Sequence, residues 1–436
     1  MKVSFFGAAD EVGRSCIMIS TDKTKILLDA GVKLGSTEEY PIIDDDQLKH
    51  VDGIFISHAH LDHSGYLPHI YTAGYRGDTF ATKPTIELTN VLLGDYIRIS
   101  NPANISKEGM GELSRHFKII EYNKPFLFRD LTIKFQPAGH ILGSALISIS
   151  DGKSKVVYTG DINLMKTRLL EGADLKNLEA DTLITESTYG ADKDSFPRTH
   201  DTEQKLLKSI NETLKTGGKV MVPSFAVGRA QEVLFIFDDY MNSGVLHKVP
   251  LYIDGMISKA LRIHRHNVIY CREELQKRIL MSDYDPFKSP NFTIVETKSQ
   301  RNRIVAGSES SIIVTTSGML SGGPIMFYLS KLANGPDNKM IMVGYQASGT
   351  LGRAMQEGAK TININGADIP ARLQVETYHL SAHADRAQLE SIPAKIRGVK
   401  NIFVVHGEHE KAEQLKAALS RKYNAVVPKL GETFSI

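Results

Sequence analysis

The stretch "GIFISHAHLDHSGYLP", residues 53–68, places four potential metal ligands within six positions: His58, His60, Asp62 and His63. They follow the apolar run "GIFIS", which is typical of a buried strand. Imidazole nitrogens and carboxylate oxygens are ligands that suit zinc and similar metals. Four such side chains after a buried strand have no use in packing and carry a desolvation cost. We therefore interpret the stretch as part of a metal site.

The spacing within the stretch favours two points of attachment. His58 and His60 stand two apart and can point to the same side of an extended segment. Asp62 and His63 lie past the turn and can reach a second metal position. Two metal ions a few Å apart would use all four side chains, whereas one ion would not need so many.

Other apolar strands of the chain also end in polar side chains. Asp29 follows "KILL" and His140 follows "IKFQPAG". Asp161 follows "VVYTG", and His406 follows "NIFVV" near residue 400. Side chains at strand ends are held by a rigid sheet and are free to converge on one site. A carboxylate such as Asp161 could bridge two metals there.

Composition narrows the class of protein. The chain has 436 residues, 42% hydrophobic and 23% charged, and a formal net charge of +2. Nucleic-acid contacts must therefore come from local patches or backbone donors rather than from a global positive field. The only two cysteines, Cys16 and Cys271, argue against a disulfide framework. With no signal peptide and no apolar run long enough to span a bilayer, we expect a cytoplasmic protein without a membrane segment.

The middle of the chain has a different pattern of predicted helices and strands from its ends. Residues 201–218 form an amphipathic helix pattern with a glycine stop, followed by a strand at 219–225 and a helix at 228–244. Further buried strands are predicted at 249–255, 310–318 and 339–346. This alternation predicts a parallel sheet flanked by helices. We expect an inserted domain at 188–361 that interrupts a first domain formed by 1–187 and 362–436.

The strand-end motifs resemble a known superfamily. "SHAHLDHSG", with "LLDAG" before it and "PAGHILGSA" and "YTGDIN" after it, is similar to the metallo-β-lactamase fold. The resemblance implies an α/β protein with a four-layer αβ/βα sandwich and a site for two zinc ions. It assigns His58, His60 and His140 to the first ion and Asp62, His63 and His406 to the second, with Asp161 bridging. It also implies that Asp29 orients histidines of the ligand loop.

Three further motifs resemble the β-CASP branch of nucleic-acid nucleases. They are "LITESTYG" with Glu186, "HLSAHAD" with His383 and "FVVHGE" with His406. The resemblance covers essentially the whole chain, and "EVGRSC" (residues 11–16) is similar to archaeal members. It implies a homodimer, and the compact length resembles short homologues of the polyadenylation-factor nuclease without appended RNA-binding domains. His406 in the third motif favours the RNA-processing members over the DNA-repair members.

Three loops rich in glycine and serine follow strands of the inserted domain. Their backbone N–H groups could cradle phosphates, although any one of them could be an ordinary turn. Three loops at strand ends of one domain, on the side of the metal site, make a nucleic-acid cleft the better interpretation. The candidate RNA-binding residues are Ser224, Arg229, Ser317, Gly318, Met319, Ser348, Gly349, Thr350 and Arg353.

These motifs predict a zinc-dependent ribonuclease that acts on single-stranded RNA through metal-activated hydroxide. His383 would donate a proton to the leaving oxygen or stabilise its negative charge. Glu186 would orient a histidine, His383 or His406, and Asp62 completes the expected catalytic set. We expect a 5′→3′ exonuclease with endonuclease activity. A purely endonucleolytic 3′-end-processing nuclease is the first alternative.

Two further functions are less compatible with the sequence. A small-molecule hydrolase of the same fold would not need an inserted domain of about 170 residues with phosphate-type loops. A non-catalytic RNA-binding scaffold is disfavoured because every expected ligand is present. The basic stretches 260–267 and 298–303 could line an RNA path or form an ordinary solvated surface.

Overall fold

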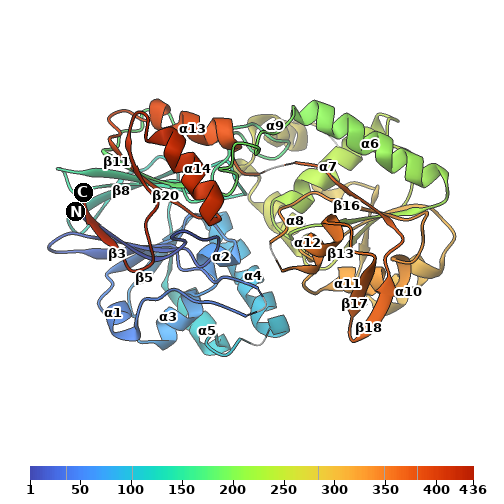
Figure 1. Ribbon diagram of the computed structural model, residues 1–436, viewed down its shortest axis with the longest axis horizontal. Coiled ribbons are helices and arrows are strands. Elements are labelled where there is room, and N and C mark those ends of the chain that lie inside the picture. The colour runs from blue at the N-terminus through green and yellow to red at the C-terminus, as the bar shows by residue number, and fades with distance from the viewer. Residues whose placement is uncertain (36, 101, 283, 348, 381) are drawn as a thin grey trace. The chain divides into compact units, whose positions relative to one another are not determined.

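The computed structural model describes residues 1–35, 37–100, 102–282, 284–347, 349–380 and 382–436 (Figure 1). The described chain divides into two compact units, of which the first is Met1–Ser195 with Ala382–Ile436 and the second is Phe196–Ser381. The boundaries predicted from the sequence were 187/188 and 361/362. The later boundary differs because strand β19 (Gln374–Thr377) pairs in parallel with β16 (Lys339–Met342) and extends the sheet of the inserted unit.

The first unit contains two sheets, each with seven strands among the described residues. The strand order of the first sheet is β22 (Thr433–Ser435), β1 (Lys2–Gly7), β2 (Cys16–Ser20), β3 (Lys25–Leu28), β4 (Gly53–Phe55), β5 (Asp78–Ala81) and β6 (Phe117–Ile119). The order of the second sheet is β21 (Asn424–Val426), β20 (Asn401–Val405), β11 (Thr182–Glu186), β10 (Lys155–Tyr158), β9 (Ala145–Ser150), β8 (Leu131–Pro137) and β7 (Phe126–Phe128).

Helices cover the outer faces of these two sheets. Those against the first sheet are α1 (Asp45–Lys49), α2 (Leu61–Ser64), α3 (Leu67–Thr72), α4 (Lys83–Ser100) and α5 (Lys107–His116). Those against the second sheet are α13 (Arg386–Lys395) and α14 (His409–Leu419). An apolar cluster that includes Ile17, Phe55 and Ile147 packs between the inner faces of the two sheets. The order helix, sheet, sheet, helix is the four-layer αβ/βα sandwich that the sequence predicted.

Strand direction places the predicted site residues at one edge of each sheet. β3 and β4 run parallel, as do β10, β11 and β20. β8 runs in the same direction as β10 because both are antiparallel to β9. The carboxyl ends of parallel strands meet at the same edge of a sheet. The side chains that follow these strands are therefore brought together by topology alone.

The inserted unit is built around a parallel sheet. Its described strands, in spatial order, are β14 (Phe292–Val295), β13 (Leu251–Asp254), β15 (Ser311–Thr315), β12 (Lys219–Pro223), β16 and β19, and every pairing is parallel. The strands β12, β15 and β16 are buried along their whole length, as expected for a sheet covered on both faces. The predicted parallel sheet flanked by helices is confirmed.

The other elements of the inserted unit are helices, two short 3-10 turns and a hairpin. They are α6 (Thr199–Lys215), α7 (Arg229–Asn242), α8 (Ile257–His266), η1 (Val268–Tyr270), α9 (Glu273–Met281), η2 (Pro286–Lys288), α10 (Lys298–Ala306), α11 (Pro324–Leu332), α12 (Leu351–Gln356), β17 (Thr361–Ile364) and β18 (Ala367–Pro370).

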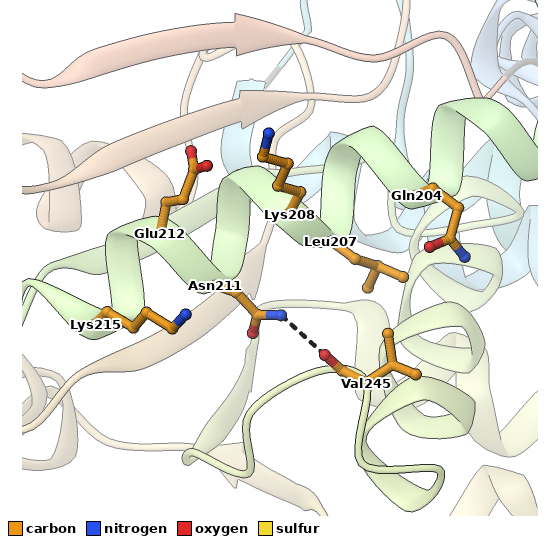
Figure 2. Close-up of a pocket in the computed structure, with 7 residues that line it drawn as sticks. All are labelled: Gln204, Leu207, Lys208, Asn211, Glu212, Lys215 and Val245. Carbon is orange, nitrogen blue, oxygen red and sulfur yellow. Dashed lines mark hydrogen bonds between the residues drawn. The ribbon is translucent and has the colours of Figure 1, made fainter.

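Helix α6 shows how the pattern produces an element. Leu206, Leu207, Ile210 and Leu214 recur at helical spacing and are buried, and Gly217 follows the helix with a positive φ of 86°. A cavity of about 340 Å³ lies beside this helix (Figure 2), lined by Gln204, Leu207, Lys208, Asn211, Glu212, Lys215 and Val245, none of which is a predicted site residue. Within the described residues, no helix is long and apolar enough to cross a membrane.

Candidate metal centre

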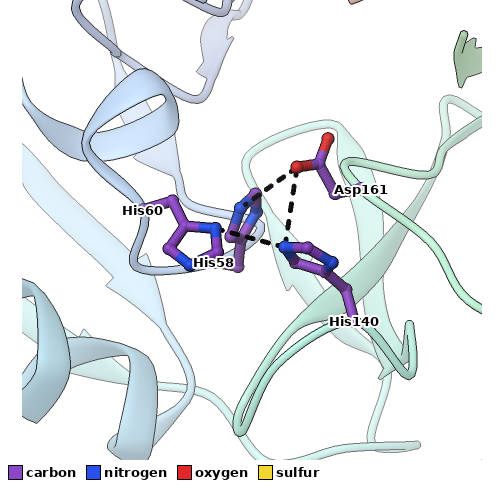
Figure 3. A group of neighbouring side chains, drawn as sticks. All are labelled: His58, His60, His140 and Asp161. Atoms are coloured by element: carbon purple, nitrogen blue, oxygen red, sulfur yellow. Dashed lines mark hydrogen bonds and ion pairs between the residues drawn. The ribbon is translucent and has the colours of Figure 1, made fainter. Parts of the chain in front are cut away.

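Side chains that follow the three strands β4, β8 and β20 converge on the carboxylate of Asp161, which itself follows β10. Its Oδ2 lies 3.5 Å from His58 Nε2 and 3.6 Å from His140 Nε2 (Figure 3). Its Oδ1 lies 3.4 Å from both His63 Nε2 and His406 Nδ1. The two oxygens of one carboxylate thus face two different pairs of histidines, which is the arrangement a bridging ligand requires.

The two remaining predicted ligands join the same two groups. His60 Nδ1 lies 3.2 Å from His140 Nε2, and Figure 3 shows the rings of His58, His60 and His140 facing one another. Asp62 Oδ2 lies 3.4 Å from His406 Nε2. The structure therefore brings all seven predicted ligands together. We call His58, His60 and His140 the first half-site, and Asp62, His63 and His406 the second half-site.

Helix α2 and the loop after β3 explain how Asp62 and His63 are placed. α2 is only four residues long and carries both side chains. Ala30 N donates to His63 O at 2.8 Å, so the loop and the helix touch backbone to backbone. A Cβ atom at Gly31 would lie 1.7 Å from Asp62 O, and only glycine permits this approach.

Buried polar atoms at the site lack ordinary partners. His58 and His63 are fully buried, and Asp161 and His406 are nearly so. Among the described residues, His58 Nε2, His63 Nε2, His406 Nε2 and Asp161 Oδ1 make no hydrogen bond and face oppositely charged or polar site atoms only at 3.4–3.5 Å, although leaving such atoms unsatisfied is costly. Two atoms bound to one tetrahedral zinc ion, each at about 2.0–2.1 Å, lie about 3.4 Å apart. The residues present therefore fit metal ions.

The protonation states of three of the ligands suit metal binding. Burial lowers the pKa of His58 and of His140 well below the ordinary value, so both imidazoles are neutral and offer a lone pair. Burial acts in the opposite direction on Asp161, but the nearby His406 and His63 hold the pKa of this carboxyl well below its usual range. Asp161 is therefore an anion that can bind two cations.

A buried carboxylate behind the ligands fixes the orientation of two of them. Asp29 Oδ2 accepts hydrogen bonds from His63 Nδ1, Ser57 Oγ and Tyr158 OH, each at 2.7 Å, and Oδ1 accepts from Ser57 N. Ser57 Oγ also lies 3.0 Å from His58 Nδ1. One carboxylate thus orients His63 directly and His58 through Ser57. These contacts fix both rings with Nε2 facing Asp161.

His383 and Glu186 form a separate pair beside Asp161. His383 Nδ1 lies 3.0 Å from Glu186 Oε2 and 3.9 Å from Asp161 Oδ2. Glu186 is buried and its Oε1 also accepts from Ile162 N at 2.7 Å. The His383 side chain is 17% exposed and that of Asp62 is 33% exposed, so solvent reaches the site on their side.

The sequence interpretation missed several groups that support the ligands. Ser57 and Tyr158 hold Asp29, and the carbonyl oxygen of Ala382 accepts from His140 Nδ1 at 2.8 Å. Ser57 stands directly before His58, and Tyr158 stands three positions before Asp161. Closeness to a ligand was the only signal for these two residues, and a backbone carbonyl gives no signal at all.

In the inserted unit, the predicted RNA-binding loops follow β12, β15 and β16 at one edge of the sheet. Ser224 follows β12, Ser317, Gly318 and Met319 follow β15, and Gly349, Thr350 and Arg353 lie between β16 and the end of α12. Ser348 lies outside the described residues. Arg229 is the first residue of α7 and is buried. β12 and β15 are neighbours, yet the chain leaves β12 toward β13 and leaves β15 toward β16 on the other side, and ligands bind at such switch points.

Hydrogen bonds tie these loops to one another. Ser224 N donates to Thr315 O at 2.9 Å, and Gly352 N donates to Met319 O at 3.2 Å. Gln346, which is buried, donates from Nε2 to Gly318 O at 2.9 Å. The loops therefore form one connected surface at the sheet edge.

Several side chains of this edge already have structural partners. Thr350 Oγ1 caps α12 by accepting from Arg353 N, and Arg353 Nε donates to Glu357 Oε1 at 2.6 Å. Ser317 Oγ donates to Gly322 O at 3.2 Å. Of the basic stretch 298–303, Arg301 makes a bidentate pair with the buried Asp254. Phosphate contacts at these loops would therefore rely mainly on backbone N–H groups.

Comparisons with known proteins agree with this architecture. Residues 18–188 match the metallo-β-lactamase superfamily domain, residues 230–355 match the Beta-Casp domain, and residues 368–428 match the Zn-dependent metallo-hydrolase RNA specificity domain. A solved structure of a protein of unknown function from Enterococcus faecalis V583 is similar over 99% of both chains, with a TM-score of 0.61. At 15% identity, this likeness shows the fold alone.

Curated relatives cover almost the whole chain. A transcription termination factor FttA from Methanothermobacter thermautotrophicus is 37% identical over 441 residues, which is 97% of this chain and 69% of the relative. The protein of the same name from Methanocaldococcus jannaschii is 37% identical over 428 residues, which is 94% of this chain and 67% of the relative. Membership in the superfamily implies metal binding, and the centre around Asp161 fits it. The chain belongs to the β-CASP family of the metallo-β-lactamase superfamily.

Proposed function

We propose that this protein is a ribonuclease that binds two zinc ions and hydrolyses phosphodiester bonds of single-stranded RNA. The observation that carries the proposal is the His383–Glu186 pair beside Asp161, where seven metal-type ligands converge. A metal site for binding alone has no need of a partly exposed histidine backed by a buried carboxylate. The matching RNA specificity domain and the name of the curated relatives support RNA as the substrate.

The chemistry divides between the metals and the side chains. When bound, divalent metal ions lower the pKa of a water molecule and polarise the phosphoryl oxygens. Glu186 accepts the Nδ1–H of His383, which fixes the ring, so that a proton held at Nε2 can be given to the leaving oxygen. Asp29, Ser57 and the Ala382 carbonyl keep the ligand rings in place during this step.

The inserted unit supplies substrate binding in this proposal. The backbone N–H groups of the loops after β12, β15 and β16 bind RNA phosphates, as in other loops rich in glycine that follow parallel strands. The hydrogen bonds between these loops fix the positions of the N–H donors in the absence of RNA.

For the mode of cleavage we propose 5′→3′ exonuclease activity with additional endonuclease activity. The alternative is a purely endonucleolytic 3′-end-processing nuclease, which cuts RNA only internally. We also propose that the chain forms a homodimer, as the family resemblance implies. Light scattering of the purified protein measures its mass in solution and so tests the homodimer.

Digestion of one RNA with either a 5′ monophosphate or a 5′ triphosphate tests the function. The proposal expects hydrolysis that depends on bound zinc, release of mononucleotides from the 5′ end, and faster release from the monophosphate. Internal fragments alone from both RNAs would establish the endonucleolytic alternative. Zinc-loaded protein that leaves both RNAs intact would overturn the proposal.

A further inference from the structure

The loop between β1 and β2 contains "EVGRS", which none of the roles above uses. Ala8, Asp10 and Arg14 adopt positive φ values of 56°, 60° and 41°, and Gly13 adopts 96°. Residues other than glycine rarely adopt such values. A backbone of this kind persists only where the surrounding structure holds it, and it is found most often at functional sites.

The backbone of this loop holds two residues of the second half-site. Ala8 O accepts from His406 N at 2.8 Å, and Ser15 N donates to Asp62 O at 2.8 Å. Glu11 O accepts from Gly407 N at 3.1 Å. Asp62 and His406 come from opposite ends of the chain, so the loop spans the two elements that must meet. The first half-site has other supports, namely Ser57 and the Ala382 carbonyl.

Side-chain ion pairs fix the loop in this position. Glu11 lies 2.5 Å from Arg14 Nε and 2.8 Å from Lys33 Nζ. Glu39 lies 3.1 Å from Arg14 Nη2 and 3.0 Å from Lys33 Nζ. Arg14 Nη1 also donates to the carbonyl oxygen of Tyr40 at 3.0 Å.

Two of these four side chains are well shielded from solvent. The Arg14 side chain is 11% exposed and that of Glu11 is 13% exposed. Removing one partner of such a pair leaves the other charge poorly solvated, which disturbs the local structure more than the loss of an exposed pair does. Glu11 and Arg14 are therefore the residues on which the shape of the loop depends most.

We propose that Glu11 and Arg14 are positioning residues for the second half-site, acting through the backbone of residues 8–15. The inference rests on the metal pair of the proposed function and deepens it, because it assigns a role at one metal only. Loss of either side chain relaxes the loop and separates Asp62 from His406. The binding of the ion that these two ligands share is then weaker. The ion held by His140 keeps its ligands.

Equilibrium dialysis of the full chain against Zn²⁺ tests this assignment. Asp62→Ala and His140→Ala serve as references that show which binding step belongs to which half-site. Glu11→Ala and Arg14→Ala should weaken the step that Asp62→Ala removes by about 10- to 100-fold. They should change the step that His140→Ala removes by about twofold at most. Glu11→Gln, which keeps the shape of the side chain, should show the same selective loss with a smaller amplitude.

The chain offers a matched control in Glu179. This carboxylate also pairs with two cations, Lys155 and Arg397, at the end of the second sheet away from the site. Glu179→Ala should leave both binding steps unchanged. Equal weakening of both steps by the Glu11 and Arg14 variants, or no weakening, would overturn the proposal. Two tightly bound Zn²⁺ ions in a wild-type protein that does not cut RNA would contradict the ribonuclease proposal and leave this test intact.

Discussion

The metal centre of the first unit and the loop edge of the inserted unit lie at the ends of strands, but they use different chemical groups. At the metal centre, side chains carry the chemistry and are buried with unsatisfied nitrogens and oxygens pointing at one another. At the loop edge, side chains such as Thr350 and Arg353 are engaged within their own unit. Its backbone N–H groups carry the proposed binding.

This difference teaches which variants each region tolerates. A side chain that supplies a ligand atom cannot be replaced without loss of that atom. A backbone donor survives most substitutions and is disturbed only when the path of the chain changes. Side-chain deletions should therefore separate functions sharply at the metal centre, whereas backbone changes should be needed at the loop edge.

Asp161→Ala should have the largest effect of all. Both half-sites lose the carboxylate that faces them, so metal content measured by elemental analysis should fall strongly and RNA hydrolysis should fall to background. The exposed Asp22 provides a control, because Asp22→Ala should retain both. Retention of two zinc ions in the Asp161 variant would refute the bridging role.

His383→Ala should come next and should separate chemistry from metal binding. Turnover should fall by about 10²- to 10⁴-fold, the usual contribution of a positioned acid, while zinc content stays unchanged. His200→Ala, at an exposed position of α6, should leave turnover unaltered. If the His383 variant instead lost zinc and kept its turnover per bound ion, His383 would be a metal ligand and not the acid.

The same difference explains what the sequence could predict. The stretch around His58 was readable because side-chain type and spacing carry the metal chemistry, and the strand-end pattern predicted that Asp161 and His406 would join it. The parallel sheet of the inserted unit was also predictable, because β12, β15 and β16 are short, largely apolar runs.

Features that depend on tertiary contact were not predictable. The role of Ser57 depends on Asp29, which lies 28 positions earlier, and the role of the Ala382 carbonyl depends on His140, 242 positions away. Strand β19 was assigned to the wrong side of the boundary at 361/362 because a short edge strand, partly exposed, has no clear apolar signal. The support given by residues 8–15 comes from backbone conformation, which residue types do not encode directly.

Gly352→Ala should give a smaller, selective effect at the loop edge. A Cβ atom at Gly352 would lie 1.8 Å from Gln346 Oε1 and 3.0 Å from Met319 O. Gln346 would have to move and lose its bond to Gly318, so the loops should separate and the KM for RNA should rise by about tenfold. Zinc content should not change.

Gly111 in α5 is a suitable control, because nothing lies within 4 Å of an added Cβ there. Gly111→Ala should leave the KM for RNA unchanged. A loss of zinc in the Gly352 variant would show that the two regions are not functionally separate, and an unchanged KM would remove the loop edge from RNA binding.

The smallest effect concerns His264, a buried histidine that is not one of the seven metal-type ligands. It lies in α8, is fully buried, and its Nδ1 donates to Ala260 O at 2.7 Å. Burial lowers its pKa from 6.5 to about 4. The imidazole is therefore neutral in the folded protein, whereas the unfolded chain binds a proton below about pH 6.5. The stability that neutral His264 contributes is complete above about pH 6.5 and is lost as the pH falls toward 4, by about 3 kcal/mol in total.

Melting temperatures measured from about pH 7 to about pH 4 test this prediction. The melting temperature of the wild type should fall more steeply than that of His264→Leu, because only the wild type loses this contribution. His266→Leu, at an exposed position of the same helix, should follow the wild type. Parallel curves for all three proteins would show that His264 is protonated without cost. Burial alone would then not suffice to keep a histidine of this protein neutral. The neutral state of buried histidines at the metal centre would have to come from their neighbours.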